Sequence, residues 1–143
     1  MGPGLGALTD ELEKIEKELT LVEYDNKMVE YWQIEREKNV VHADALEVDW
    51  KKQLEVPSAL VSNLPYQIGS RLFVDLSFVS AKPKVMILMF QKEVAESLYG
   101  ERKKGDISLL SLVRETFWDS SFLLEAGSID FCLLYTSPSP RDS

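Results

Sequence analysis

The sequence predicts an α/β fold built on a mainly parallel sheet, and three observations lead to this prediction. Short apolar runs alternate along the chain with segments in which apolar residues recur every three or four positions, as strands alternate with helices. A glycine-rich turn opens the first helical segment, and an acidic residue follows about 20 residues later. A rigid proline-containing loop, Asn63 to Tyr66, follows an apolar run at 59–61. An open α/β sheet places its reactive groups in such loops at the strand ends.

Length, composition and charge limit the classes of protein to be considered. The chain has 143 residues, 45% of them hydrophobic and 28% charged, which suffices for one core. No apolar run approaches the roughly 20 residues of a membrane span, and no basic-then-apolar leader is present, so we expect a cytoplasmic protein without membrane contact. One cysteine, Cys132, and one histidine exclude an internal disulfide and a Cys/His metal cluster, so no metal site is predicted. A net charge of −8 disfavours strong nucleic-acid binding by this chain alone.

The first candidate binding element is the loop that contains Gly2, Gly4 and Gly6. It precedes a helix whose apolar positions are Leu12, Ile15 and Leu19. Glycines at such a turn let backbone N–H groups approach a ligand closely, and a helix N-terminus favours anionic groups. The spacing G-x-G-x-G differs from the G-x-G-x-x-G of dinucleotide binders. The alternative interpretation is a flexible glycine-rich leader.

Two acidic residues follow at the ends of the next apolar runs. The run at 19–22 ends at Glu23, where an acidic side chain can accept both hydroxyls of a ribose; a solvated surface glutamate is the alternative. A short strand at 40–45 places Asp44 where its side chain can accept from the amino group of an adenine. His42 in this strand is interpreted as structural. Between the two runs, residues 25–38 form a predicted helix.

That helix carries an aromatic stripe, Met28, Tyr31 and Trp32, which we interpret as core and not as a cofactor site. Its charged end at 35–38 is interpreted as a solvated face.

The stretch Asn63-Leu64-Pro65-Tyr66 suits methylation of an exocyclic amine on a nucleobase. The Asn63 side-chain oxygen and the Leu64 carbonyl can accept the amine's N–H groups and leave its lone pair facing a donor. Pro65 fixes its own φ and favours an extended Leu64. Tyr66 can stack on the base, which must leave its helix to be reached. An ordinary proline-containing turn at a strand end is the alternative interpretation.

The remaining elements continue the alternation of helices and strands. A helix is marked by Leu72, Phe73, Leu76 and Val79, and a turn follows at 82–84. The apolar run 85–90 predicts a strand buried on both faces. We then expect a short helix from Gln91, a charged loop at 100–106, a helix at 109–118 and a last strand at 122–124.

Together these motifs resemble the ribosomal RNA adenine N6-dimethyltransferase family, whose members use S-adenosylmethionine (SAM). The resemblance covers residues 2–131 in consistent order. It rests on Gly-Pro-Gly-Leu-Gly-Ala-Leu-Thr from residue 2, Leu-Thr-Leu-Val-Glu-Tyr-Asp from 19, Asp-Ala at 44–45, Ser-Asn-Leu-Pro-Tyr-Gln-Ile from 62 and Phe-Gln-Lys-Glu-Val-Ala from 90. It implies a Rossmann-like SAM-dependent methyltransferase core, acting as a monomer in ribosome biogenesis.

The resemblance also implies roles for individual residues. Gly2, Gly4 and Gly6 would lie near the amino-acid portion of SAM, Glu23 at its ribose, and Asp44 with Ala45 at its adenine. Asn63, Leu64, Pro65 and Tyr66 would hold the target base, with Asn63 also beside the cofactor, and Phe131 would sandwich the flipped adenine opposite Tyr66. The implied substrate is a pair of adjacent adenines near the 3′ end of small-subunit rRNA, each dimethylated, within the pre-ribosomal small subunit.

The chain also departs from the family pattern. The family usually has arginine where this chain has Ser97, and Tyr-Gly where it has Ile107-Ser108, which affects the substrate side. Measured against the family, the N-terminal segment with the first central strand and the small basic C-terminal domain are absent, which accounts for the negative charge. We therefore expect a truncated methyltransferase domain at residues 1–131 that is inactive by itself.

The ending, residues 132–143, suits no packed element of this fold. Residues 132–142 resemble the translation of a transposase-based sequencing adapter, so we expect a non-native tail; a natural Ser/Pro-rich disordered tail is the alternative.

Three rival functions remain. A DNA adenine N6-methyltransferase also suits an Asn-x-Pro-Tyr loop, but the Gln-Lys-Glu-Val-Ala stretch favours the rRNA family. A nicotinamide-dependent dehydrogenase requires a different glycine spacing. The third rival is a non-catalytic assembly factor that binds pre-ribosomal RNA. SAM-dependent methylation by the protein would exclude it.

Overall fold

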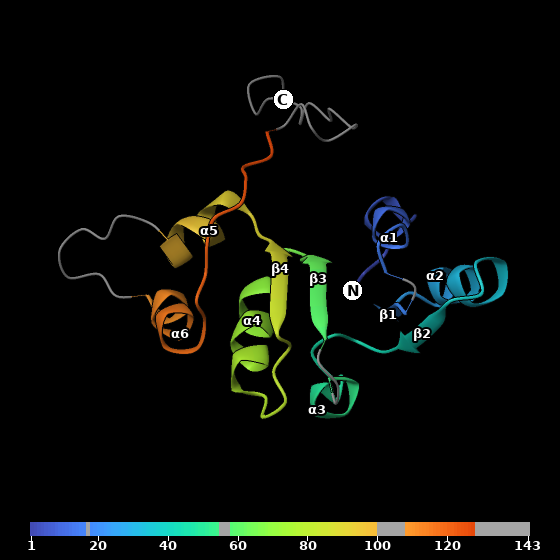
Figure 1. The fold of residues 1–143 in the computed structure, drawn as a ribbon, viewed down its shortest axis with the longest axis horizontal. Coiled ribbons are helices and arrows are strands. Elements are labelled where there is room, and N and C mark those ends of the chain that lie inside the picture. The colour runs from blue at the N-terminus through green and yellow to red at the C-terminus, as the bar shows by residue number, and fades with distance from the viewer. Residues whose placement is uncertain (17, 55–57, 100–107, 128–143) are drawn as a thin grey trace, which may run out of the picture.

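The computed structural model describes residues 1–16, 18–54, 58–99 and 108–127, and Figure 1 shows the arrangement of its helices and strands. In this part of the chain, strands alternate with helices as predicted, and all strand pairing is parallel. Strand β1 (Thr20–Glu23) pairs with β2 (Asn39–His42), and β3 (Ala59–Asn63) pairs with β4 (Val85–Met89). The predicted α/β class with a parallel sheet is therefore confirmed.

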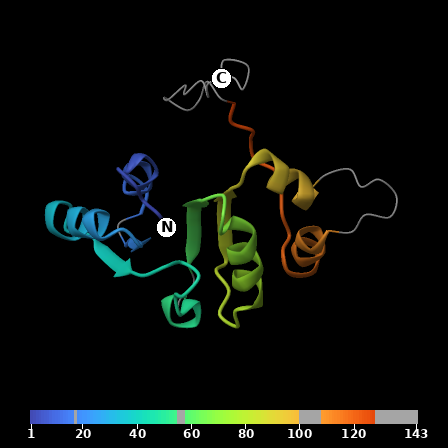
Figure 2. The ribbon, with the colours of Figure 1, turned by 180° about the vertical axis from the view of Figure 1, so that it is seen from behind.

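The two strand pairs form separate sheets, and the N-terminus lies between them in Figures 1 and 2. The Met1 ammonium donates to the Val61 carbonyl (3.3 Å), and the Ser62 hydroxyl donates to the Met1 carbonyl (3.1 Å). On the other side, the Gly2 N–H donates to the Val22 carbonyl (2.8 Å). Residues 1 and 2 thus bridge the facing edges of β1 and β3. The hydrogen bonding between strands is therefore interrupted between β1 and β3.

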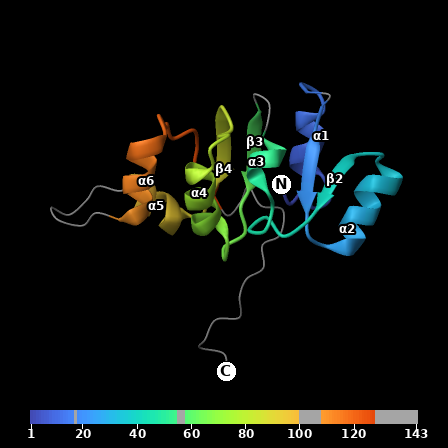
Figure 3. The ribbon, with the colours of Figure 1, turned by 90° about the horizontal axis from the view of Figure 1, so that it is seen from below.

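Helices α1 and α2 lie beside the β1–β2 pair, and α3 to α6 lie beside the β3–β4 pair, as the view from below shows (Figure 3). The α-helices are α1 (Ala7–Leu12), α2 (Asn26–Glu30), α3 (Trp50–Gln53), α4 (Gly69–Phe78), α5 (Lys92–Tyr99) and α6 (Leu109–Phe117). Side chains cap three of them, because Asp25, Asp49 and Ser108 accept backbone N–H bonds at the starts of α2, α3 and α6. Helix α1 ends at Leu12, earlier than the apolar spacing predicted, and Ile15 beyond it is exposed.

The helix predicted for residues 25–38 is shorter and changes type. Helix α2 continues as a π-helical turn, η1 (Tyr31–Glu35), and ends there because Glu37 adopts a left-handed φ of 50°. Trp32 is completely buried, so the interpretation of this aromatic as core is confirmed.

The core lies between the half-sheets and the helices that cover one of their faces. One cluster contains Val22 of β1, Leu60 of β3, and Leu72 and Leu76 of α4. A second cluster, Phe73, Leu98 and Val113, joins α4, α5 and α6. The first cluster spans both half-sheets, so the interior is continuous although the sheet is not.

Two predictions about the C-terminal half are wrong. Strand β4 is not buried on both faces, because Val85, Ile87 and Met89 are exposed while the residues between them pack inward. No described element covers the outer face of β4, so its apolar run becomes an alternating strand. Residues 122–124 form no strand and are exposed, since an apolar run becomes a strand only where a neighbouring edge offers hydrogen bonds.

None of the described helices is both long and apolar enough to cross a membrane.

Candidate functional site

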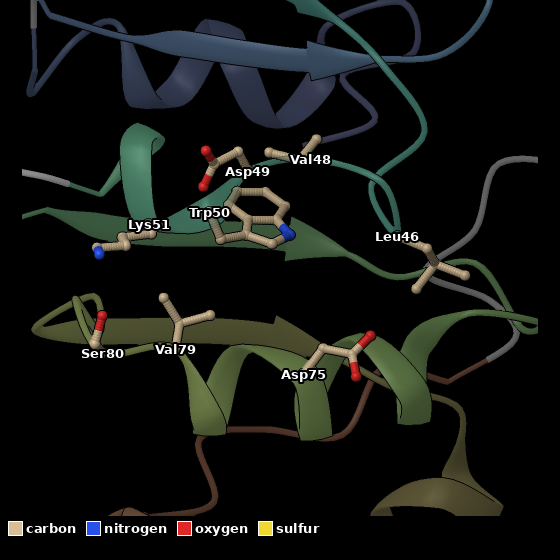
Figure 4. A pocket seen from close by; sticks show the side chains of 8 residues that line it. All are labelled: Leu46, Val48, Asp49, Trp50, Lys51, Asp75, Val79 and Ser80. Atoms are coloured by element: carbon tan, nitrogen blue, oxygen red, sulfur yellow. The ribbon is translucent and has the colours of Figure 1, made fainter.

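The predicted site residues lie at the carboxyl ends of the strands. Glu23 is the last residue of β1, Asn63 is the last of β3, and Asp44 comes two residues after the end of β2. The arrowheads of β1, β3 and β4 point the same way in Figure 4, so these strand ends face the same side of the molecule although they belong to two sheets. A hydrogen bond from the Ala43 N–H to the Glu23 carbonyl (3.0 Å) joins the carboxyl ends of β2 and β1 directly. The edge at the carboxyl ends of the strands is where an open α/β fold binds ligands.

The glycine loop (residues 2–6) is an ordered turn that needs its glycines for two different reasons. Gly2, Gly4 and Gly6 have φ values of 58°, 52° and 107°, all in the left-handed region. A Cβ added at Gly2 or Gly4 would meet no atom within 4 Å, so space is open beside the backbone there. A Cβ at Gly6 would lie 2.8 Å from Cη2 of Trp32, which leaves no room for a side chain.

The Glu23 carboxylate is oriented by the backbone that follows it. Its Oε1 accepts from the Tyr24 N–H (2.7 Å) and the Asp25 N–H (2.9 Å). These two hydrogen bonds to Oε1 fix the orientation of the carboxylate at the end of β1. The position of the second oxygen, Oε2, is thereby fixed as well. The nearby His42 Nε2 lies 3.1 Å from the Tyr24 carbonyl, which agrees with the structural interpretation of this histidine.

Asp44 and Ala45 form a tight turn. Asp44 Oδ1 accepts from the Leu46 N–H (2.9 Å), and the Asp44 carbonyl accepts from the Glu47 N–H (2.9 Å). The Ala45 carbonyl accepts from Nε1 of the buried Trp50 (2.9 Å). The hydrogen bond from the Trp50 indole to the Ala45 carbonyl was not predicted from the sequence. A tryptophan directly after the helix-capping Asp49 is the sequence signal that could have indicated it.

The loop from Asn63 to Tyr66 is held by backbone hydrogen bonds, and Leu64 is the one residue of the four that is buried. The Leu64 N–H donates to the Met89 carbonyl (3.1 Å), and the Leu64 side chain is buried against Gly69 of α4. The Pro65 carbonyl accepts from the N–H groups of Ile68 (3.3 Å) and Gly69 (3.1 Å), which starts α4. Asn63 is exposed, and Tyr66 is 79% exposed, so both side chains are accessible to a ligand.

Other predicted residues stand outside this edge or outside the described residues. Phe131 lies outside the described residues, as does the tail at 132–143. Of the positions that depart from the family pattern, Ser97 and Ser108 contact each other, because the Ser108 hydroxyl donates to the Ser97 carbonyl (2.7 Å). This contact joins the start of α6 to α5. Among the described residues, no group of three or more His, Cys, Asp or Glu side chains is arranged to hold a metal ion.

A pocket of about 430 Å³ lies between α3 and α4, away from the predicted site (Figure 4). Its lining residues are Leu46, Val48, Asp49, Trp50, Lys51, Asp75, Val79 and Ser80. None of them is a predicted site residue, and the tryptophan in its wall is held by its bond to the Ala45 carbonyl. The pocket is a space between two helices, and it is lined by none of the candidate site residues.

Comparison with known proteins shows the family of this chain. The family described as "Ribosomal RNA adenine dimethylase" matches residues 1–142. The chain is 39% identical over 132 residues to the "Ribosomal RNA small subunit methyltransferase A" of Bdellovibrio bacteriovorus, which covers 92% of this chain and 48% of that protein. The proteins of the same name from Dehalococcoides mccartyi and Chromobacterium violaceum are 37% and 36% identical, over 78% and 79% of this chain and 40% and 44% of their own lengths.

The chain thus spans about half the length of the curated relatives it matches. The family match covers nearly all of the sequence, including both the glycine loop and the loop from Asn63 to Tyr66. The chain therefore belongs to the ribosomal RNA adenine dimethylase family.

Proposed function

We propose that the protein containing these residues transfers methyl groups from SAM to N6 of two adjacent adenines near the 3′ end of small-subunit rRNA, dimethylating each. It acts as a cytoplasmic monomer on the pre-ribosomal small subunit during ribosome biogenesis. The observation that carries the proposal is that the loop from Asn63 to Tyr66 and Glu23 lie at the carboxyl ends of β3 and β1, two strands that residues 1 and 2 bridge, in a member of this family.

The Asn63 loop is suited to an aromatic amine. An exocyclic amine is a weak nucleophile because its lone pair is conjugated with the ring, so its N–H groups must be held while the lone pair faces the donor. The Asn63 side chain is exposed at the strand end, and the Leu64 backbone is fixed by the bond from its N–H to Met89. The Asn63 oxygen and the Leu64 carbonyl then act as the two acceptors.

The base is reached by leaving its stack. Tyr66 presents an exposed ring beside these acceptors, on which the flipped adenine stacks. Phe131 is assigned to the opposite face of the same base. SAM carries its methyl group on a cationic sulfonium, so the amine can attack before its proton is lost and no residue is assigned as a catalytic base. Positioning and electrostatic stabilisation then supply most of the rate.

The described residues fit the cofactor. The open space beside Gly2 and Gly4 accommodates the amino-acid portion at the glycine loop. Glu23, already oriented by the Tyr24 and Asp25 amides, is assigned to the ribose hydroxyls through its second oxygen. The turn at Asp44 and Ala45 is assigned to the adenine.

Replacing Glu23 with alanine is expected to weaken SAM binding by about 1–3 kcal/mol, the usual effect of losing a charged hydrogen-bond partner. The measurement is titration calorimetry with SAM on the complete gene product that contains these residues. Glu30→Ala, which removes an exposed glutamate from α2 behind this edge, is the matched control and is expected to leave the affinity unchanged. Equal affinities of the Glu23 variant and the parent would contradict the ribose assignment.

The reaction itself is tested by incubating the complete gene product with small ribosomal subunits that lack the modification and with labelled SAM. The expected product is N6,N6-dimethyladenine at two adjacent positions near the 3′ end of the rRNA. Methylation of duplex DNA in preference to these particles would favour a DNA adenine methyltransferase. Tight binding to the particles without methyl transfer would favour a non-catalytic assembly factor.

A further inference from the structure

Trp32 lies on the helical segment that follows β1, yet its indole contacts the glycine loop. Its Nε1 donates to the Gly4 carbonyl at 3.0 Å. Its ring edge lies against Gly6, since Cη2 and Cζ2 would be 2.8 and 3.2 Å from a Cβ at that position. One completely buried side chain therefore restrains two of the glycines in the loop.

The backbone around Trp32 has an unusual conformation that sets this placement. Trp32 belongs to the π-helical turn η1, and the turn closes with a bond from the Arg36 N–H to the Tyr31 carbonyl (3.2 Å). The Lys38 N–H then bonds the Trp32 carbonyl (2.9 Å). Single π-helical turns are rare and occur frequently at functional sites. Here the π-helical turn contains Trp32, the residue whose side chain contacts the glycine loop.

The same segment also holds the helix that follows the glycine loop. The Arg36 guanidinium lies 4.9 Å from the centre of the Trp32 ring, and its Nη2 bonds Asp10 Oδ1 (2.6 Å). Lys38 forms an ion pair with Glu13 Oε1 (2.9 Å). Helix α1 has only six residues and is too short to be stable alone. The loop and its helix therefore depend on the segment from Trp32 to Lys38 for their position.

We propose that Trp32 is a positioning residue that holds the glycine loop in its cofactor-binding conformation, and that Arg36 supports it from the outer face. This inference rests on the proposed function, which assigns the loop to SAM. The bond from the indole to the Gly4 carbonyl restrains rotation of the Gly4 peptide, so the loop amides favour one orientation before the cofactor arrives. Loss of this bond lowers cofactor affinity, because the loop must then be ordered during binding. The chemical step is unaffected once SAM is bound.

The test compares Trp32→Phe with the parent in the complete gene product. Phenylalanine keeps most of the buried ring and removes the N–H donor. Trp118→Phe is the matched control, because Trp118 also donates its indole N–H (2.8 Å, to the Ser77 hydroxyl) but lies on the far side of the molecule, at the end of α6. We expect the Trp32 variant to raise the Kd and KM for SAM about tenfold while kcat at saturating SAM changes less than about twofold. The Trp118 variant changes none of these quantities.

A second measurement is independent of the cofactor. Amide hydrogen exchange without SAM is expected to be about tenfold faster at residues 4–8 in Trp32→Phe, and unchanged there in Trp118→Phe. Arg36→Gln, a change at a partly exposed residue, is expected to accelerate the same amides to a smaller extent, and it replaces Trp32→Phe if that variant fails to fold.

The outcomes separate the two hypotheses. A parent protein that binds no SAM would overturn the proposed function. If the parent binds SAM and Trp32→Phe binds it equally well, only the positioning role would be overturned. The same holds if hydrogen exchange at residues 4–8 is unchanged in both Trp32→Phe and Arg36→Gln. A fall in kcat with unchanged KM would likewise overturn it, because Trp32 would then act on the chemical step.

Discussion

The 143-residue chain by itself is expected to bind no SAM measurably and to show no cooperative thermal unfolding, whereas a longer gene product with a strand between β1 and β3 is expected to do both. The reason is the gap between the half-sheets. The facing edges of β1 and β3 are bridged only by residues 1 and 2 among the residues described.

The cost of this gap is large compared with the stability of a domain. A buried backbone N–H or C=O without a partner costs about 1–3 kcal/mol, and a domain's net stability is only about 5–15 kcal/mol. In this bridge the Met1 amino group is buried, and burial lowers its pKa by disfavouring the charged form. An internal peptide N–H would donate to the Val61 carbonyl without that charge. The uncovered apolar side chains Val85, Ile87 and Met89 add a surface prone to association.

Scanning calorimetry and SAM titration on the two proteins provide the measurement. If the half-sheets instead closed the gap by pairing β1 with β3 directly, the glycine loop would move away from Glu23 and Asp44, and the cofactor site would still be lost. A cooperative transition together with micromolar SAM binding in the 143-residue chain would show that the central strand is not required.

Replacing Asn63 with alanine in the complete gene product is expected to lower methyl transfer about 100-fold, the effect of losing the alignment of one reacting group. SAM affinity is expected to change less than about twofold, because the proposed contact is to the target amine. The loop should keep its shape, since its backbone is fixed by the Leu64 bond to Met89 and by the turn at Pro65. Single-turnover methylation at saturating SAM and calorimetry measure the two quantities separately.

The matched control is Asn39→Ala. Asn39 is the first residue of β2, at the opposite end of the strand from the site, and its side chain donates to the Thr20 hydroxyl (3.0 Å). This variant is expected to retain full methyl transfer. If Asn63→Ala and Glu23→Ala weakened SAM binding equally, the division between base contact and cofactor contact would be contradicted.

The local conformation of this protein could be predicted from its sequence. The apolar runs at β1, β2 and β3 are strands because β-branched and apolar residues there alternate with turn signals, and these signals act between near neighbours. The glycines at positions 2, 4 and 6 do adopt left-handed φ values, which few other residues tolerate. The loop from Asn63 to Tyr66 ends a buried strand and opens a helix, as proline and the following glycine required.

The tertiary structure decided everything that depends on segments far apart. Whether the run at β4 is buried on one face or two, and whether residues 122–124 pair as a strand, depends on which elements cover that face and that edge. Spacing could place Trp32 in the core, but only the fold brings its indole to the Gly4 carbonyl, 28 residues away in sequence. Periodicity fixes which way a side chain points along its own helix or strand, whereas its partner is set by how the elements pack.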